Sequence, residues 1–249
     1  MVLSTNLIYT DVTATKRGRV VDRTGRLKIE RPQSLSEIAA DHIREAIILG
    51  DFRLGDPLTE NALSKLLGIS KTPVREAIAA LKREGILQGD SQKGARVFTQ
   101  TPEQLHQMCV YRFTLETAAV RMAMKVDPEG LILRLETICQ DMTKARDTHD
   151  FAGYLKLDRH FHDAFFEFAG NQFLREGYGS VSPKVATLRT YLSLAPKRVD
   201  TSYGEHIQIT QMLKASRIED ALNILHEQID RGSHAIDEIT KTRLASPAQ

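Results

Sequence analysis

Two short amphipathic segments joined by only three residues, Gly68-Ile69-Ser70, constrain the fold of this chain most. Thr59 is a suitable N-cap for the first segment, and apolar residues recur after it at helical spacing up to Gly68. The second tolerates Pro73 because first-turn amides have no intrahelical acceptor, and it is expected to end near Glu84. Helices this short are stable only when their apolar faces pack on further elements.

The flanking residues predict those further elements. Upstream, Ser34 and Glu37 form a capping box before an apolar-periodic helix that Gly50 ends. Downstream, Ile86-Leu87, a polar turn and the run from Ala95 to Phe98 predict a two-stranded hairpin. Three helices followed by a hairpin predict a winged helix-turn-helix domain over residues 32–100.

The rest of the chain, from residue 101 onward, has almost continuous helical periodicity. Pro183 is expected to kink or split one of its helices. An antiparallel bundle is the simplest packing for them, so we expect a mainly α protein with an all-helical domain over 101–243 and a tail over 244–249. The expected helices lie near 102–126, 128–147, 150–169, 171–195, 201–215 and 218–242.

Charge is unevenly distributed along the 249 residues, because the net charge of +2 hides a basic first hundred residues and a slightly acidic remainder. A basic segment favours a polyanionic partner. Residues 1–31 are interpreted as a flexible basic arm, with a solvated tail as the alternative. The basic residues of this arm are Lys16, Arg17, Arg19, Arg23, Arg26, Lys28 and Arg31.

Membrane insertion and disulfide formation are not expected. No apolar run is long enough for a spanning helix, and Leu7-Ile8-Tyr9 is too short for a signal peptide. These features place the protein in the cytoplasm. Cys109 and Cys139 lie among apolar neighbours in helical patterns, where small buried thiols are common.

The second of the two short helices has a polar face suited to DNA. Arg75 is placed to bind a guanine edge with both ends of its guanidinium, and Lys71 and Thr72 suit phosphate. In the hairpin, Lys93, Gly94 and Arg96 suit the minor groove or its phosphates.

The string from Leu58 to Ile78, with its core Ser-Lys-Thr-Pro-Val-Arg-Glu-Ala, closely resembles the GntR family of bacterial transcription regulators. The resemblance extends to Val97. It implies that Arg75 and Gly94 contact DNA and that Lys71 replaces an arginine that is usual there. Lysine keeps the attraction to phosphate but loses the bidentate contact. Asn61 likewise stands where some members carry a contacting arginine.

Four polar residues of the helical half have a pattern that suits a metal ion. Asp158 and His162 are four residues apart and so leave the same face of one helix, and His206 and His226 follow on separate helices. One carboxylate and three imidazoles suit a divalent transition metal, with zinc preferred and nickel or manganese as alternatives. Two octahedral positions would stay vacant for a carboxylate effector.

This set, with its surrounding residues, resembles the FCD effector domain of FadR-type GntR regulators over roughly residues 102–240. The resemblance implies that Asp158, His162, His206 and His226 bind the metal. It also implies effector contacts. Arg112 is a candidate for them, with an ion pair to Glu116 as the alternative. Asn171, whose alternative role is a helix cap, and Arg189 are further candidates.

The sequence as a whole predicts a DNA-binding transcription regulator and not an enzyme. We expect a homodimeric repressor whose affinity for a double-stranded operator depends on a small organic acid bound beside the metal. In one alternative the metal ion is itself the signal. In another the site is a metal-dependent hydrolase, but Glu205 points about 100° away from the adjacent ligand, which leaves that site without a general base.

Overall fold

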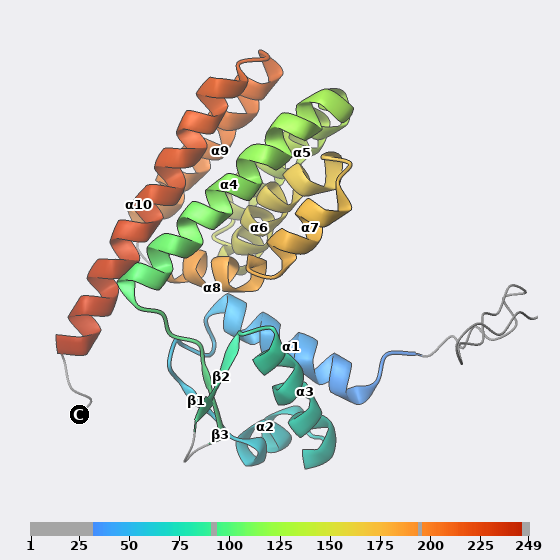
Figure 1. The fold of residues 1–249 in the computed structure, drawn as a ribbon, viewed down its shortest axis with the longest axis vertical. Coiled ribbons are helices and arrows are strands. Elements are labelled where there is room, and N and C mark those ends of the chain that lie inside the picture. Colours follow the sequence, from blue (N-terminus) through green and yellow to red (C-terminus); the bar gives the residue numbers. More distant parts are fainter. Residues whose placement is uncertain (1–31, 91–93, 194–195, 246–249) are drawn as a thin grey trace, which may run out of the picture. The chain divides into compact units, whose positions relative to one another are not determined.

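The computed structural model describes residues 32–90, 94–193 and 196–245 (Figure 1). The predicted basic arm, residues 1–31, lies outside the described residues. By packing, the chain divides into Met1–Leu35 and Ser36–Gln249. All of the elements discussed below belong to the second unit, apart from the first residue of its first helix.

The N-terminal part of that unit forms the predicted winged helix-turn-helix. Thr59 caps α2 by accepting a hydrogen bond from the Ala62 amide, and Gly68 ends it with a φ of 67°. Gly85, with a φ of 72°, follows the recognition helix α3. The elements are α1 (Leu35–Leu49), β1 (Pro57–Leu58), α2 (Glu60–Leu67), α3 (Lys71–Arg83), β2 (Leu87–Asp90) and β3 (Gly94–Val97).

The hairpin predicted from the sequence is confirmed as β2 and β3, and the structure adds a third strand. The antiparallel sheet has the order β1-β3-β2, with Leu58 paired to Ala95. The sequence analysis missed β1 because two residues are too few to show an alternating pattern. Buried Leu58, Ala95 and Val97 join this sheet to the core of the three helices.

The remaining elements are helices, as predicted. Pro183 lies at the expected break, where the single helix predicted over 171–195 is divided in two. The next helix begins at Pro196 rather than near 201, because proline fits the first turn. The helices are α4 (Pro102–Val126), α5 (Pro128–Asp147), α6 (Phe151–Phe168), α7 (Gln172–Gly179), α8 (Ser182–Ser193), α9 (Pro196–Lys214) and α10 (Ile218–Ala245).

These helices pack as a bundle in which α6 is central. Helix α4 packs on α6 and α10, and α5 packs on α6 and α9 (Figure 1). The aromatic residues Phe161, Phe165 and Phe166 of α6 are fully buried in the core of the bundle. Among the described residues, no helix is long and apolar enough to cross a membrane.

Candidate metal, effector and DNA-binding sites

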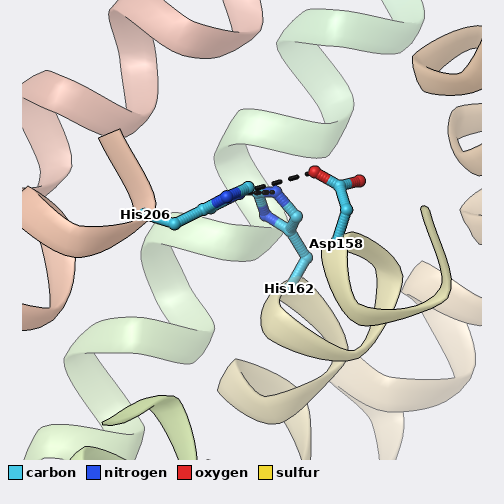
Figure 2. A group of neighbouring side chains, drawn as sticks. All are labelled: Asp158, His162 and His206. Atoms are coloured by element: carbon cyan, nitrogen blue, oxygen red, sulfur yellow. Dashed lines mark hydrogen bonds and ion pairs between the residues drawn. The ribbon is translucent and has the colours of Figure 1, made fainter. Parts of the chain in front are cut away.

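Three of the four predicted metal ligands meet inside the bundle. Asp158 and His162 come from α6 and His206 from α9, and their nearest donor atoms all lie within 4.8 Å of one another (Figure 2). The Nε2 atom of His206 is 3.5 Å from Nε2 of His162 and 3.5 Å from Oδ1 of Asp158. All three side chains are buried.

The spacing and chemistry of these donors fit a divalent transition metal. Ligand atoms about 2.1 Å from a common ion stand about 3 to 3.5 Å from one another, so the three donors need little movement to share one. Imidazole nitrogens and carboxylate oxygens suit zinc, nickel and manganese.

Glu116 of α4 holds His162 in the protonation state that a ligand needs. The Nδ1 atom of His162 lies 2.8 Å from Oε2 of Glu116. Burial lowers the pKa of His162 to about 4, so the ring is neutral near pH 7. Burial alone would raise the pKa of Glu116, but Arg112 and His162 outweigh it and lower this pKa. The ring therefore donates Nδ1–H to a carboxylate and keeps a lone pair on Nε2.

Arg112 makes contacts that fit both roles expected for it. Its Nε atom donates to Oε1 of Glu116 at 2.6 Å, which is the predicted ion pair. Its Nη2 atom lies 3.3 Å from Nε2 of His162, so it also reaches the nitrogen that faces the metal ligands. The guanidinium is buried at the edge of the donor group.

Arg189 of α8 is a second cation at this site. Its Nε atom is 3.0 Å from Oδ2 of Asp158, an ion pair that lowers the pKa of the carboxyl although burial opposes the shift. Within the described part of the chain, its two buried Nη atoms have no hydrogen-bond partner. Buried donors without acceptors are rare, and they suit an anionic ligand.

The structure does not bring His226 into the group. This imidazole is exposed on α10, where it packs edge-on against Phe113 with 4.6 Å between ring centroids. Gln228 lies two residues further along and contacts His206 instead. Two residues turn a helix by about 200°, so the two side chains leave nearly opposite faces.

Asn171 takes the capping role that was the alternative to effector binding. Its Oδ1 atom accepts from the Leu174 amide at 3.2 Å at the start of α7. Its Nδ2 atom lies 3.7 Å from Sδ of Met122. Neither contact is with a residue of the donor group, so we leave Asn171 out of the site.

Acidification should destabilise the metal-free protein below pH 6.5. Unfolded histidine binds a proton near pH 6.5, whereas burial lowers the pKa of His162 to about 4 and of His206 to about 3. Below pH 6.5 the unfolded state therefore binds more protons than the folded state, so the free energy of unfolding decreases as the pH is lowered. Burial raises the pKa of Asp163 to about 6, so below that pH the folded state gains a proton that the unfolded state lacks. This proton offsets one of the two histidine protons. These three groups together contribute a loss of about 1.4 kcal/mol per pH unit.

Urea unfolding in the presence of a chelator at pH 7, 6 and 5 measures this slope. His206→Gln should make the net dependence shallower, because one fewer buried histidine then opposes Asp163. His106→Gln, at an exposed position on α4, is the matched control and should leave the slope unchanged. A wild-type stability that does not vary over this range would contradict the buried neutral histidines.

The predicted DNA-contacting residues lie on exposed parts of the winged helix-turn-helix. Lys71 and Thr72 occupy the exposed first turn of α3. Arg75 follows on the same helix with 66% of its side chain exposed, and its guanidinium binds both carboxylate oxygens of Glu60 at 3.0 to 3.2 Å. An exposed pair of this kind is weak, so Arg75 can exchange Glu60 for DNA.

The wing has the backbone geometry that was expected of it. Gly94 opens β3 with a φ of 96°, which favours glycine, and its carbonyl accepts from Nζ of Lys82 at 2.9 Å. Arg96 is exposed on β3. Lys93 lies outside the described residues. The contact from Lys82, which was not predicted, ties the recognition helix to the wing.

Comparisons with known proteins match this architecture in both halves. The FCD domain model matches residues 107–231, and the model of bacterial regulatory proteins of the gntR family matches residues 35–97. These matches define the class as a transcription regulator with a DNA-binding domain and a domain for a small-molecule effector. The chain belongs to the GntR family and carries an FCD domain.

Relatives and structures agree with this assignment. The Nta operon transcriptional regulator of Aminobacter aminovorans is 31% identical over 68% of this chain and 78% of its own length. The transcriptional repressor NanR of Cronobacter sakazakii is 25% identical over 84% of this chain and 89% of its own. A GntR transcriptional regulator from Rhodococcus sp. RHA1 shares the fold at a TM-score of 0.71 and 23% identity, covering 82% and 98% of the two chains. The protein is thus a regulator and not an enzyme, as predicted.

Proposed function

We propose that this protein is a repressor whose operator affinity is controlled by a small carboxylate effector bound beside a divalent cation. The observation that carries the proposal is the buried group of Asp158, His162 and His206, with the buried Arg112 and the 11% exposed side chain of Arg189 next to it. Zinc is the cation we favour, with nickel and manganese as alternatives. The cation would supply an electrophilic centre for the effector's oxygen atoms.

The charges around the group favour an anionic effector. The guanidinium groups of Arg112 and Arg189 balance the carboxylates of Asp158 and Glu116. A divalent cation would therefore leave an uncompensated positive charge in a buried place, which an anion neutralises. Arg189 offers hydrogen-bond donors that have no acceptor in the described structure. A carboxylate matches both the charge and the shape of that group.

Arg112 links the two ligands. Its Nη2 lies 3.3 Å from Nε2 of His162. When His162 binds the cation through Nε2, that atom can no longer accept a hydrogen bond from Arg112. The guanidinium of Arg112 then becomes available to the effector. We therefore expect the cation to strengthen effector binding, which is positive coupling between the two ligands.

Helix α8 could transmit effector binding to the DNA-binding elements. The helix and these elements belong to the same packed unit. One side of α8 presents Arg189 to Asp158. Val185 and Leu188 of the same helix belong to the hydrophobic core formed by α1, α3 and the sheet. The Tyr191 hydroxyl accepts from the Leu54 amide at 2.7 Å. A rotation of α8 toward a bound anion would thus alter packing beneath the DNA-binding helices.

DNA binding also suggests how the protein works in the cell. A homodimer presents two copies of α3 to the two halves of a near-palindromic operator, which is the common geometry for helix-turn-helix proteins. We propose such a dimer acting in the cytoplasm. Effector binding would shift the population of the dimer between states of different DNA affinity.

Thermal unfolding with ligands tests the proposal directly. A ligand at a hundred times its Kd stabilises a protein by about 2.7 kcal/mol, which is about 5 to 10 °C for a chain of this size. We expect hydroxy, keto, dicarboxylic or sugar acids to give such a shift when zinc, nickel or manganese is present, and a smaller one with a chelator.

Operator release then separates the two regulatory models. Release that needs both the acid and the metal supports the proposal. Release by the metal alone supports the alternative in which the ion is the signal. Arg189→Lys is the test of the anion contact, because lysine keeps the charge but loses the planar pair of donors. Unchanged acid binding by this variant would remove Arg189 from the effector site.

A further inference from the structure

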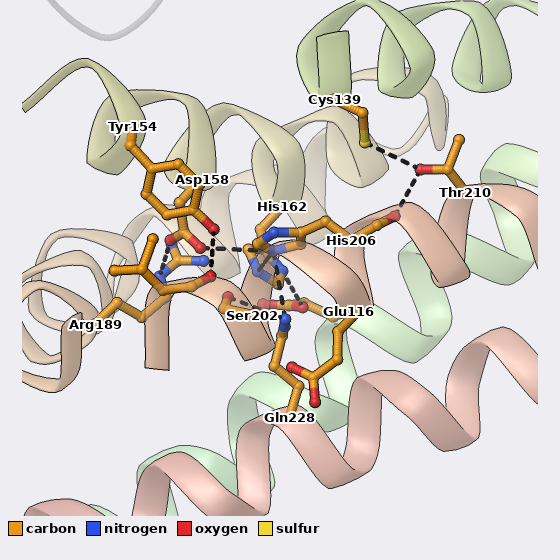
Figure 3. A network of polar contacts seen from close by, with 12 residues as sticks. Glu116, Cys139, Tyr154, Asp158, His162, Arg189, Ser202, His206, Thr210 and Gln228 are labelled. Carbon is orange, nitrogen blue, oxygen red and sulfur yellow. Dashed lines mark hydrogen bonds and ion pairs between the residues drawn. The ribbon is translucent and has the colours of Figure 1, made fainter. Parts of the chain in front are cut away.

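A fourth side chain faces the candidate cation site from a third helix. Gln228 of α10 places its Nε2 atom 3.4 Å from Nε2 of His206 and 3.5 Å from Oγ of Ser202 (Figure 3). Its Oε1 atom is buried and has no hydrogen-bond partner among the described residues. A buried amide oxygen of this kind lacks the acceptor role that it normally fills.

The nitrogen that Gln228 contacts is the common point of the group. Nε2 of His206 lies 3.5 Å from Nε2 of His162, 3.5 Å from Oδ1 of Asp158 and 3.4 Å from the amide of Gln228. A 180° rotation of the carboxamide about its last bond exchanges its oxygen and nitrogen. The oxygen then takes the place next to Nε2 of His206, and it supplies a lone pair where the N–H stood.

We propose that Gln228 is the fourth protein ligand of the cation site and binds through Oε1. This inference rests on the cation site of the proposed function. The donor set becomes two imidazole nitrogens, one carboxylate oxygen and one amide oxygen. Amide and carboxylate oxygens suit harder ions such as manganese, whereas imidazole suits zinc and nickel. A site with Gln228 should therefore prefer zinc over manganese less strongly than a site with a third imidazole.

The rival role for Gln228 is structural, namely donation of an N–H to His206 or Ser202. Two substitutions separate these roles. Gln228→Glu keeps oxygen donors in the same place but removes the N–H, and Gln228→Leu removes both. A ligand is therefore preserved in the glutamate variant and lost in the leucine variant. A structural donor is lost in both.

Cation titrations of the full-length chain test this inference. Metal-free wild-type protein and its variants are titrated with Mn²⁺ and with Zn²⁺ by calorimetry, and Co²⁺ is added for its visible absorption spectrum. We expect Gln228→Leu to weaken Mn²⁺ binding by about tenfold and to change the Co²⁺ spectrum. Gln228→Glu should bind Mn²⁺ at least as tightly as the wild type. Gln228→His should tighten Zn²⁺ binding more than Mn²⁺ binding.

His226→Ala is the matched control, because it removes an exposed imidazole from the same helix and should change neither affinity nor spectrum. Two results would overturn the inference while leaving the cation site intact. These are wild-type affinity in Gln228→Leu, or equal weakness in Gln228→Leu and Gln228→Glu. A wild-type protein that binds none of the three ions would overturn the cation site itself, and with it the role of Gln228.

Discussion

Arg75→Ala should strongly weaken specific operator binding while the protein stays folded. A bidentate contact to a base contributes about 1 to 3 kcal/mol, and the proposed dimer would make it twice, so affinity should fall by about 30-fold to 10⁴-fold. Arg75 is 66% exposed, and within the described residues its ion pair is with Glu60, an exposed contact worth little to stability. The melting temperature of the variant should therefore remain close to that of the wild type.

The measurement is a gel-shift titration at fixed salt, because phosphate contacts make every affinity salt-dependent. The operator is obtained by selection from random DNA with the wild-type protein. Arg83→Ala, an exposed arginine in the last turn of α3, is the control and should lose far less affinity. If Arg75→Ala and the wild type bind the selected operator equally, Arg75 does not read bases.

The elements of the DNA-binding domain were predictable because local interactions decide them. Thr59 caps α2, and Gly68 ends it with a positive φ, as their residue types indicate. The hairpin followed from apolar residues on either side of a polar turn. The short strand β1 was not predictable, since Leu58 pairs with Ala95 only through the folded sheet.

The candidate site was predictable only where its residues share a helix. Asp158 and His162 lie four residues apart on α6, so the spacing alone placed them together. The partners on other helices depend on how each helix is rotated about its axis. Resemblance therefore assigned His226 to a face that the structure gives to Gln228, two residues away.

The contacts that set the chemistry of the site were harder still to foresee. Glu116 was expected only as an ion-pair partner of Arg112, and its contact with His162 spans forty-six residues of sequence. The sequence offered one signal for it, an acidic residue one helical turn after Arg112. The unpartnered nitrogens of Arg189 depend on the packing of α8 and have no counterpart in the sequence.

Purified wild-type protein should carry close to one divalent ion per chain, and His206→Ala should lose it. His206 supplies the nitrogen that faces both Asp158 and His162, so its removal takes away the central donor of the group. Asp158→Asn should also lose most of the ion, because it removes the anionic ligand while it keeps the shape of the side chain. Elemental analysis after dialysis against metal-free buffer measures the ratio of ion to protein.

His226→Ala distinguishes the structural assignment from the one based on resemblance alone. An exposed imidazole that packs on Phe113 should contribute nothing to binding, so this variant should keep its ion. Loss of the ion in His226→Ala would mean that α10 turns in solution to bring that residue inward. A stoichiometry near zero in the wild type, together with normal effector binding, would remove the cation from the mechanism and leave Arg112 and Arg189 as the anchors of the effector.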